Sequence, residues 1–368
     1  MNKTVSLHRC ERYSADTIIP IVRTLYRECC APPLKGKRVL IKPNILSDHY
    51  PENAVTTHPA VVEAMIRFAV EEGAGKITVG DAPAMHGKKF KPEKCGIYEV
   101  CRRTGAEWVY FGEAFSEKTV GKRKVFVTDA LKECDVLISL PKLKTHGFML
   151  LTGAIKNTFG VIPNLYKAAQ HAVHNNTKTF ASFLVDLNEA ILPDFILMDG
   201  IVAMEGEGPS NGRPRKVGAL LASTNPLALD IVAAQLTGYS PENIPTNAEA
   251  IGRGKWLSEY DEVLYAGEGI DNLCVPDFKR VKQSGIDRIM IQYVLKRFPI
   301  LRKLERRPRF TSHRCIGCKA CIKICPQQAL YSNENKPGRI LINDKLCIRC
   351  FCCQEVCPEN AIKIHGYF

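Results

Sequence analysis

Residues 315–326 read Cys-Ile-Gly-Cys-Lys-Ala-Cys-Ile-Lys-Ile-Cys-Pro, and residues 347–358 read Cys-Ile-Arg-Cys-Phe-Cys-Cys-Gln-Glu-Val-Cys-Pro. Both stretches have the spacing C-x2-C-x2-C-x3-C-P, in which cysteine thiolates hold [4Fe–4S] clusters and the fourth cysteine of each run binds the other cluster. The sequence therefore predicts two [4Fe–4S] clusters. Their ligands would be Cys315, Cys318, Cys321 and Cys357 for one cluster, and Cys347, Cys350, Cys353 and Cys325 for the other.

The two cysteine runs form an internal repeat with an offset of 32 residues, so that Cys315 corresponds to Cys347. Such a repeat predicts a pseudo-two-fold domain in which each half lends one ligand to the other. Zinc sites and disulfides are the alternatives, but zinc favours C-x2-C pairs separated by a longer loop, and disulfides need an oxidising compartment. Cys352 corresponds to Ala320, so we expect it to be a packed thiol and not a ligand.

At 368 residues the chain is long enough for two or three domains. We predict an α/β domain at 1–278 with room for two lobes, a basic linker helix at 279–310, and a two-cluster domain at 311–368. The N-terminus lacks the apolar core of a secretory signal, and no stretch has the apolar length of a membrane span. These features predict a cytoplasmic protein.

The formal net charge of +13 is concentrated in one segment. Residues 279–309 contain eleven Lys or Arg against Asp287 and Glu305. A general nucleic-acid-binding function is not expected, because basic residues are not interleaved with base-stacking aromatics elsewhere. A basic amphipathic helix also suits contact with a membrane surface, but we favour a linker that docks its apolar side on the protein.

From Arg38 to about Asp230 the chain alternates short apolar runs with helical patterns. Residues 57–73 are typical of a helix, because Thr57 can cap it, Pro59 suits its first turn and Gly73 ends it. Further helices are expected around 98–104 and 181–191, and strands at 39–42, 77–79, 108–111, 136–140, 195–198 and 217–222. This alternation indicates an α/β fold with a mainly parallel sheet covered by helices on both faces.

Polar side chains follow nearly every predicted strand of the large domain. In open α/β sheets, ligands bind outside the carboxyl ends of the strands, and the glycine-containing segment 152–160 is expected to join that edge. We predict that one pocket is lined by Lys42, Asp81, Lys142, Lys144, His146, Lys156 and Asn157. The residues predicted to act in catalysis are Lys42, Asp81, Lys142, Lys144, His146, Lys156 and Asp199.

The lysines of this cleft favour a carboxylate or phosphate ligand, and burial would lower a lysine pKa and prepare it as a base or nucleophile. Asp81, Asp199 and Glu205 are the candidate general bases or metal ligands. The alternative for any one of these residues is a solvated loop charge. His171 and His174 are spaced i, i+3 and could bind a metal, although we favour a polar helix face.

The large domain resembles the prokaryotic family known as domain of unknown function 362. The resemblance is carried by Ile-Lys-Pro-Asn at 41–44, Gly-Asp-Ala-Pro at 80–83, Pro-Lys-Leu-Lys-Thr-His at 141–146, Thr-Gly-Ala-Ile-Lys-Asn at 152–157, and residues 199–209. Residues 311–368 resemble bacterial-type two-cluster ferredoxins, a module that family members often carry. This resemblance implies a domain architecture and no established reaction. A fainter similarity links the loop at Lys156 to the lysine loop of lactate racemase-like proteins.

Together these features predict a cytoplasmic iron–sulfur oxidoreductase. Electrons from a soluble low-potential partner would pass through the clusters to an anionic small molecule in the lysine-rich cleft, because fusion raises the effective concentration of a carrier at its user. Two alternatives stay open. One is an isomerase or lyase whose clusters are structural or sensory, and the other is an electron-transfer adaptor whose large domain docks a partner protein.

Overall fold

The centre of the computed structural model, which describes residues 2–83, 90–163, 166–174, 176–281, 306–333 and 340–366, is a mixed sheet. Its strands are β1 (Thr4–Arg9), β2 (Arg38–Pro43), β3 (Lys76–Asp81), β4 (Glu107–Tyr110), β7 (Val136–Leu140), β8 (Lys142–His146), β9 (Leu150–Thr152), β10 (Phe195–Glu205), β11 (Arg213–Ser223) and β12 (Leu264–Gly267). They run in the order β12-β1-β11-β10-β7-β2-β3-β4, with β8 joined to β10 and β9 to β8. The block from β10 to β4 is parallel, and β11 is antiparallel to both of its neighbours.

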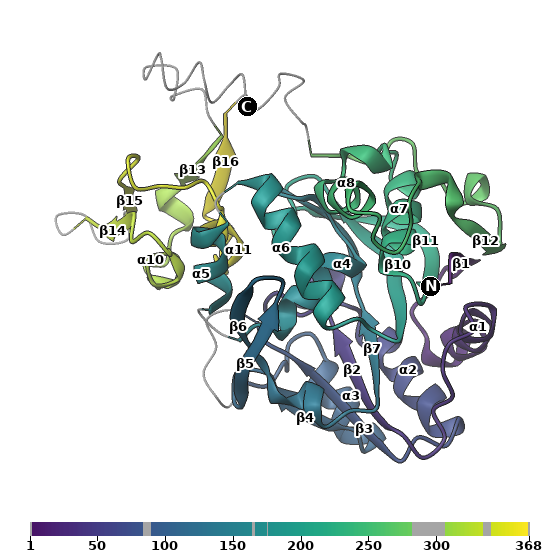
Figure 1. Cartoon of the computed structure of the whole chain (residues 1–368). Coiled ribbons are helices and arrows are strands. Elements are labelled where there is room, and N and C mark those ends of the chain that lie inside the picture. Colours follow the sequence, from purple (N-terminus) through teal and green to yellow (C-terminus); the bar gives the residue numbers. More distant parts are fainter. Residues whose placement is uncertain are drawn as a thin grey trace.

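Helices cover both faces of this sheet (Figure 1). They are α1 (Ala15–Glu28), α2 (Pro59–Glu71), α3 (Ile97–Thr104), α4 (Ala154–Asn157), α6 (Thr177–Ala190), α7 (Pro226–Leu236) and α8 (Pro245–Gly252). Successive strand residues point to opposite faces, so Val39 and Ile41 of β2 join a core with α1, α2 and α3, while Leu40 joins a second core with α6, α7 and α8. The predicted α/β fold is confirmed.

The six predicted strands are all present as β2, β3, β4, β7, β10 and β11. The residues after β7 differ from the prediction of a loop, because residues 142–146 form β8 and pair in parallel with the far half of β10. Leu143 and Thr145 alternate with three basic side chains, and all five residues are buried. The sequence predicts a loop here, because the three basic side chains obscure the two-residue alternation that is typical of a strand. The strand pair β1 and β12 and the hairpin β5 (Phe115–Val120) to β6 (Arg123–Thr128) were not predicted either.

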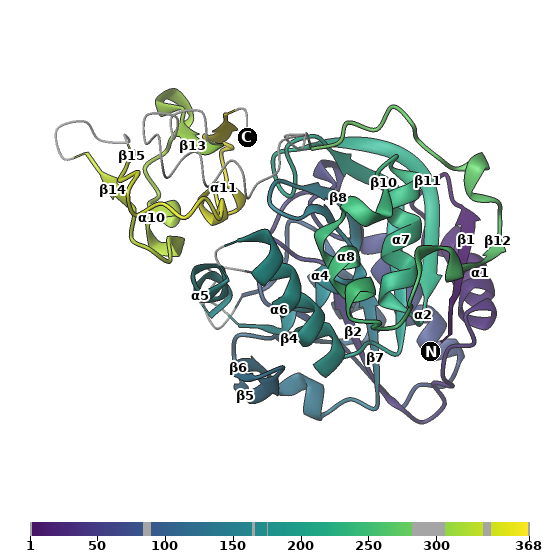
Figure 2. The same ribbon diagram turned by 45° about the horizontal axis from the view of Figure 1, so that its top comes forward.

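The cysteine-rich C-terminal part is a small domain whose described residues form two short two-stranded ribbons and two short helices (Figure 2). Strand β13 (Arg307–Phe310) pairs with β16 (Ile362–His365), and β14 (Leu330–Ser332) pairs with β15 (Ile340–Ile342). The helices are α10 (Ala320–Ile324) and α11 (Cys352–Glu355). The repeat is visible in the backbone: Gln328 and Asn360, 32 positions apart, both have a φ of 49°. The two halves are therefore built alike.

Most of the predicted linker helix, residues 282–305, lies outside the described residues. Residues 307–310, which we expected to belong to this helix, instead form β13 of the cluster domain. A proline inside a helix removes a hydrogen bond and clashes with the preceding turn, and Pro308 with Arg307 and Arg309 follows the period of a strand. The predicted domain limits otherwise stay predictions. No helix in the described part of the chain is long and apolar enough to cross a membrane.

The cluster domain packs against the large domain through α5 (Tyr166–Val173), which stands beside α10 and α11 in both views (Figures 1 and 2). Ala168 of α5 packs with Ile324 and Cys352 in a small apolar cluster. Beside it, the Asn211 side-chain amide donates a hydrogen bond of 3.1 Å to the carbonyl of Ile362. The two domains therefore share an ordered interface.

We predict that Gly80→Ala destabilises the sheet. A Cβ at Gly80 would collide with the Phe111 ring and the Val109 carbonyl, and overpacking costs about 1–3 kcal/mol. Thermal unfolding should show a lower Tm for this variant. Gly252→Ala is the control, because a Cβ there meets no atom within 4 Å. Equal Tm values for the two variants would contradict the packing described here.

Candidate functional site

Four cysteines from the two ends of the cluster domain converge on one small cavity. Its lining includes Cys315, Cys318, Cys321 and Cys357. Burial, followed by the charges of Cys357, Cys318 and Cys315, raises the pKa of Cys321 to about 11. The fourth cysteine of the second run therefore lies with the first three of the first run, as cluster ligation with exchanged fourth ligands requires.

The other four cysteines are grouped in the same way around Cys353. Burial raises the pKa of this thiol, and the charges of Cys350, Cys347, Cys321 and Cys325 act in the same direction. Each exchanged cysteine also accepts one backbone hydrogen bond, from the N–H of Ala329 to Cys325 Sγ at 3.2 Å and from that of Ala361 to Cys357 Sγ at 3.3 Å. Half-buried cysteine sulfurs that accept N–H groups fit the ligation of iron–sulfur clusters.

A cavity of about 740 Å³ lies between the two domains. The predicted cleft residues that line it are Lys42, Asp81, Lys156 and Asn157. The cluster domain forms the opposite wall, where Cys318, Cys352 and Glu355 face the same space. The structure therefore brings part of the predicted cleft and one predicted cluster ligand to a common cavity.

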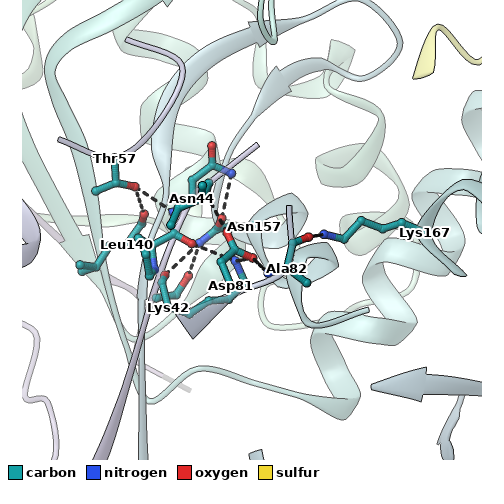
Figure 3. Close-up of polar contacts among 11 residues, drawn as sticks. Lys42, Asn44, Thr57, Asp81, Ala82, Leu140, Asn157 and Lys167 are labelled. Carbon is teal, nitrogen blue, oxygen red and sulfur yellow. Dashed lines mark hydrogen bonds and ion pairs between the residues drawn. The ribbon is translucent and has the colours of Figure 1, made fainter. Parts of the chain in front are cut away.

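Lys42 and Asp81 form a buried ion pair at the carboxyl ends of β2 and β3 (Figure 3). Their Nζ and Oδ1 atoms are 3.1 Å apart. Burial lowers the pKa of Lys42, and Asp81 opposes this shift. Asp81 also accepts the backbone N–H groups of Ile45, at 2.7 Å, and Ala82, at 2.8 Å. A side chain at Gly160 would collide with both charged groups, so the pair is enclosed on this side by bare backbone.

Asn157 connects this ion pair to the neighbouring loops. Its Oδ1 accepts from Lys42 Nζ at 3.4 Å and from the Asn44 amide at 3.1 Å, and its own amide donates to Ser139 Oγ at 2.9 Å. Thr57 holds the loop from behind, because its hydroxyl donates to the Leu140 carbonyl and accepts the N–H of Asn44 (Figure 3). Asn44 Oδ1 is buried and has no hydrogen-bond partner among the described residues.

Lys142 and Asp199 do not line this cavity and instead form a separate buried network. Lys142 Nζ lies 2.8 Å from Asp199 Oδ2 and 2.9 Å from the Tyr13 hydroxyl. Asp199 also accepts the Tyr13 hydroxyl at 2.8 Å and the backbone N–H of His58 at 2.9 Å. Each of these groups is satisfied inside the protein, and the Tyr13 ring stacks on His58. The arrangement ties the N-terminal segment to the sheet.

Lys144 and His146, the other two pocket residues of β8, are also behind the cavity wall. Lys144 Nζ donates to the Val55 carbonyl at 2.7 Å, and burial lowers its pKa well below the ordinary value. Burial, and then the charge of Lys156, lowers the pKa of His146 to about 4. His146 Nδ1 accepts two backbone N–H groups, so the proton of the neutral ring is on Nε2, which lies 3.2 Å from Glu355 Oε1.

Glu355 is thus the point at which the cluster domain enters the polar interior of the large domain. Burial alone would raise its pKa, but His146 and then Lys156 and His171 lower it to about 2. The carboxylate is therefore ionised beside a neutral histidine. The sequence did not predict a role for Glu355, because the two cysteines on either side of it indicate a metal site and nothing else.

Lys156 is the predicted lysine that is placed best to meet a ligand. Burial lowers its pKa and Glu355 opposes this shift. Among the residues that the structure describes, none accepts a hydrogen bond from its Nζ, which lies 5.9 Å from the centre of the Phe159 ring. Asp230 holds the helix that carries it, accepting the N–H of Ala154 at 2.5 Å and that of Ile155 at 3.1 Å. Asp230 was missed because it sits inside the apolar helix α7.

The two histidines of the predicted helix are buried, which differs from the polar face that we favoured. His171 stacks on Phe180 and His174 on Phe183. His171 lines the cavity, and its Nδ1 has no partner in the described structure. Glu205 lies elsewhere, 2.9 Å from Arg213 Nε. No group of three His, Cys, Asp or Glu side chains among the described residues could hold a single metal ion.

The charge of the cavity is more balanced than the sequence suggested. Among the described residues, its lining holds four lysines and four acids: Lys42, Lys94, Lys156, Lys167, Asp48, Asp81, Glu355 and Glu359. Lys167 was not predicted, because nothing in its helical position marks it. It donates to the Ala82 carbonyl (Figure 3), and burial lowers its pKa to about 8. Lys42 is neutralised by Asp81, which leaves Lys94, Lys156 and Lys167 as the described cations of the lining.

Residues 39–235 match the family described as a domain of unknown function, DUF362, and residues 314–361 match a 4Fe-4S dicluster domain. A protein of Synechocystis sp. described as thylakoid-associated is 33% identical over 304 residues, which is 79% of this chain and 93% of that protein. The chain belongs to the DUF362 family. It is also an iron–sulfur protein, with a ferredoxin-type domain fused to its DUF362 domain. Its predicted cytoplasmic location stays a prediction.

Two solved structures are weakly similar to this DUF362 protein. A Thermotoga maritima protein has a TM-score of 0.38 and 16% identity, over 56% of this chain and 55% of that chain. The lactate racemase apoprotein of Thermoanaerobacterium thermosaccharolyticum has a TM-score of 0.44 and 14% identity, over 65% of this chain and 57% of that chain. Neither similarity carries an argument about activity.

We predict that Asp230 makes stability depend on pH. Burial raises its pKa in the folded protein from 3.8 to about 7, although two backbone N–H groups oppose the shift. The folded state then holds a proton that the unfolded chain releases, so this residue's contribution to stability falls as pH rises through that window. Between about pH 4 and about pH 7, the Tm of Asp230→Asn should therefore fall less than the Tm of the wild type. Parallel Tm profiles for both proteins would exclude this titration.

Proposed function

We propose that this protein is an iron–sulfur oxidoreductase that exchanges electrons between two [4Fe–4S] clusters and a small anionic molecule in the interdomain cavity. The observation that carries the proposal is the shared lining: Cys318 of the first predicted cluster faces the same space as Lys156 and the Lys42–Asp81 pair. A redox group and a polar binding wall on opposite sides of one cavity support chemistry between them. The clusters, when bound, would supply one-electron transfer.

The proposed ligand assignment follows the two groups of cysteines. The first cluster would be held by Cys315, Cys318, Cys321 and Cys357, and the second by Cys347, Cys350, Cys353 and Cys325. The lining of the small cavity supports the first set, and the neighbours of the buried Cys353 support the second. Cys352 is in neither set, and it packs against Ala168 at the domain interface.

The large domain would bind and orient the ligand. Lys156 offers an ammonium group without a partner among the described residues, and Lys167 lies on the same wall. An ammonium in a partly dry cavity favours a carboxylate or phosphate. The Lys42–Asp81 pair would keep the backbone behind it fixed, and the cluster domain would exclude water from the other side.

Anaerobically purified protein should contain close to eight irons per chain, as two four-iron clusters require. Cys318→Ala and Cys350→Ala should each remove about half of this iron, because each takes one ligand from a different cluster. Cys352→Ala is the matched control and should keep the full content. Iron and acid-labile sulfide analysis measures all four proteins. Zinc in place of iron in unreconstituted material would overturn the assignment.

Lys156→Met should impair the use of the anionic molecule and leave the clusters intact. The clusters are first reduced with dithionite, and a panel of small carboxylates and phosphates is then tested for reoxidation, followed by the visible absorbance of the clusters. A hydrogen bond to a charged group is worth about 1.5–3 kcal/mol, so the apparent affinity should fall about 10- to 100-fold. Lys91→Met, outside the cavity lining, is the control.

The outcomes of this experiment separate the proposal from its alternatives. Clusters that no low-potential donor reduces would refute the redox function and leave the isomerase or lyase function, for which Lys156 would be the candidate base. Clusters that are reduced but reoxidised by no small molecule, only by a protein, would favour the electron-transfer adaptor. Reoxidation that is equal in Lys156→Met and the wild type would exclude the proposed binding wall.

A further inference from the structure

The ribbon of β13 and β16 has two faces of opposite character. Its register pairs Arg307 with His365 and Arg309 with Lys363. These four residues therefore share one face, and Pro308, Phe310, Ile362 and Ile364 share the other, since residues alternate along a strand. Arg309, Lys363 and His365 are exposed, whereas Pro308 and Ile362 are buried. We call the face with the four basic residues the basic ribbon face.

The charges of the basic ribbon face are not neutralised within the described structure. Like charges directly opposite each other on a strand pair are destabilising. The acidic residues in the described part of the cluster domain are Asp344, Glu355 and Glu359, and none of them forms an ion pair with the ribbon. Asp344 pairs with Arg349 at 3.0 Å, Glu355 contacts His146, and Glu359 lines the interdomain cavity. An unfavourable arrangement without a counter-charge among the described residues favours a compensating charge on a binding partner.

The opposite face of the same ribbon borders the first predicted cluster. Phe310 and Ile362 line the small cavity on which Cys315, Cys318, Cys321 and Cys357 converge. The basic ribbon face is therefore separated from that site by the thickness of one ribbon. The side chain of Ile316 lines the same cavity and is 65% exposed, which adds an apolar contact next to the charges.

We propose that the basic ribbon face docks an acidic electron-carrier protein, which passes single electrons to the first cluster or takes them from it. This inference rests on the proposed redox function. In each transfer the carrier loses or gains one electron and the cluster gains or loses it, so no atom or proton has to move. Surface charge complementarity steers such encounters and orients the partner. A protein partner suits this face because a protein bound to the basic residues would lie only one ribbon's thickness from the first predicted cluster.

The test reverses the charges of the ribbon in the full-length, cluster-loaded protein. The variant Arg309→Glu/Lys363→Glu is compared with Lys122→Glu/Lys178→Glu, which makes the same change in net charge at exposed positions of the large domain. The probe is a purified acidic ferredoxin. Its reduced form is mixed with each protein in stopped flow, and binding of its oxidised form is measured by calorimetry.

We expect the ribbon variant to be reduced about tenfold or more slowly at low salt and to bind more weakly, because opposite charges raise association rates and like charges suppress them. At about 1 M salt the difference should disappear, since the Debye length is then about 3 Å. The control variant should behave like the wild type. Reduction by dithionite should be equal in all three proteins, which shows that the clusters are intact.

Equal rates for the ribbon and control variants would refute the docking face while leaving the proposed redox function standing. Failure of dithionite to reduce the wild type would instead refute the redox function. Co-sedimentation with vesicles of anionic phospholipid provides the third comparison. If the ribbon variant loses vesicle binding but keeps its rate with the carrier, the basic ribbon face binds membranes and the present inference is wrong.

Discussion

The buried pair of Lys42 and Asp81 is the interaction on which the site depends. Their side chains are only 2% and 3% exposed, and the penalty for removing two charges from water is several kilocalories per mole for each ion unless hydrogen bonds compensate. The compensation comes from the loops after β2 and β3, from Asn157, and from the close backbone of Gly160. These segments are therefore held in one arrangement, and the cavity wall is formed before any ligand arrives.

The interface between the domains also depends on a buried charge that has a compensating polar contact. Glu355 is such a charge, and the neutral His146 with its Nε2 proton is its partner. The two residues lie on α11 and β8, so docking of the cluster domain closes the end of the sheet. The apolar contact of Ala168 with Ile324 and Cys352 lies beside it. These contacts hold the predicted cluster ligands and the lysine-bearing wall of the large domain on opposite sides of one cavity.

Sequence patterns predicted the repeated and the strongly periodic parts of this chain. The family and the α/β fold are confirmed, since apolar runs of period two or of unbroken burial mark strands such as β2 and β7. Position after a strand also found Lys42 and Asp81 of the cavity, and the glycine-containing segment 152–160 found Lys156 and Asn157. Sequence position could not separate these residues from Lys142, because the same edge of the sheet carries two polar networks. Strand β8 divides the two networks, and it was not predicted because its charged residues obscure its alternating pattern. Contacts such as Glu355 with His146 depend on docking, which no local pattern encodes.

The repeat in the cluster domain has a consequence for assembly. A domain with two similar halves could dock on the large domain in two orientations, related by a half-turn. An offset of 32 residues puts Lys323 where Glu355 stands and Ala320 where Cys352 stands. In the turned arrangement an ammonium would replace the carboxylate among Lys156 and Lys144, and like charges in that dry pocket repel strongly. The presence of Glu355 in the second half, where the first half has Lys323, thus favours the observed orientation over the turned one.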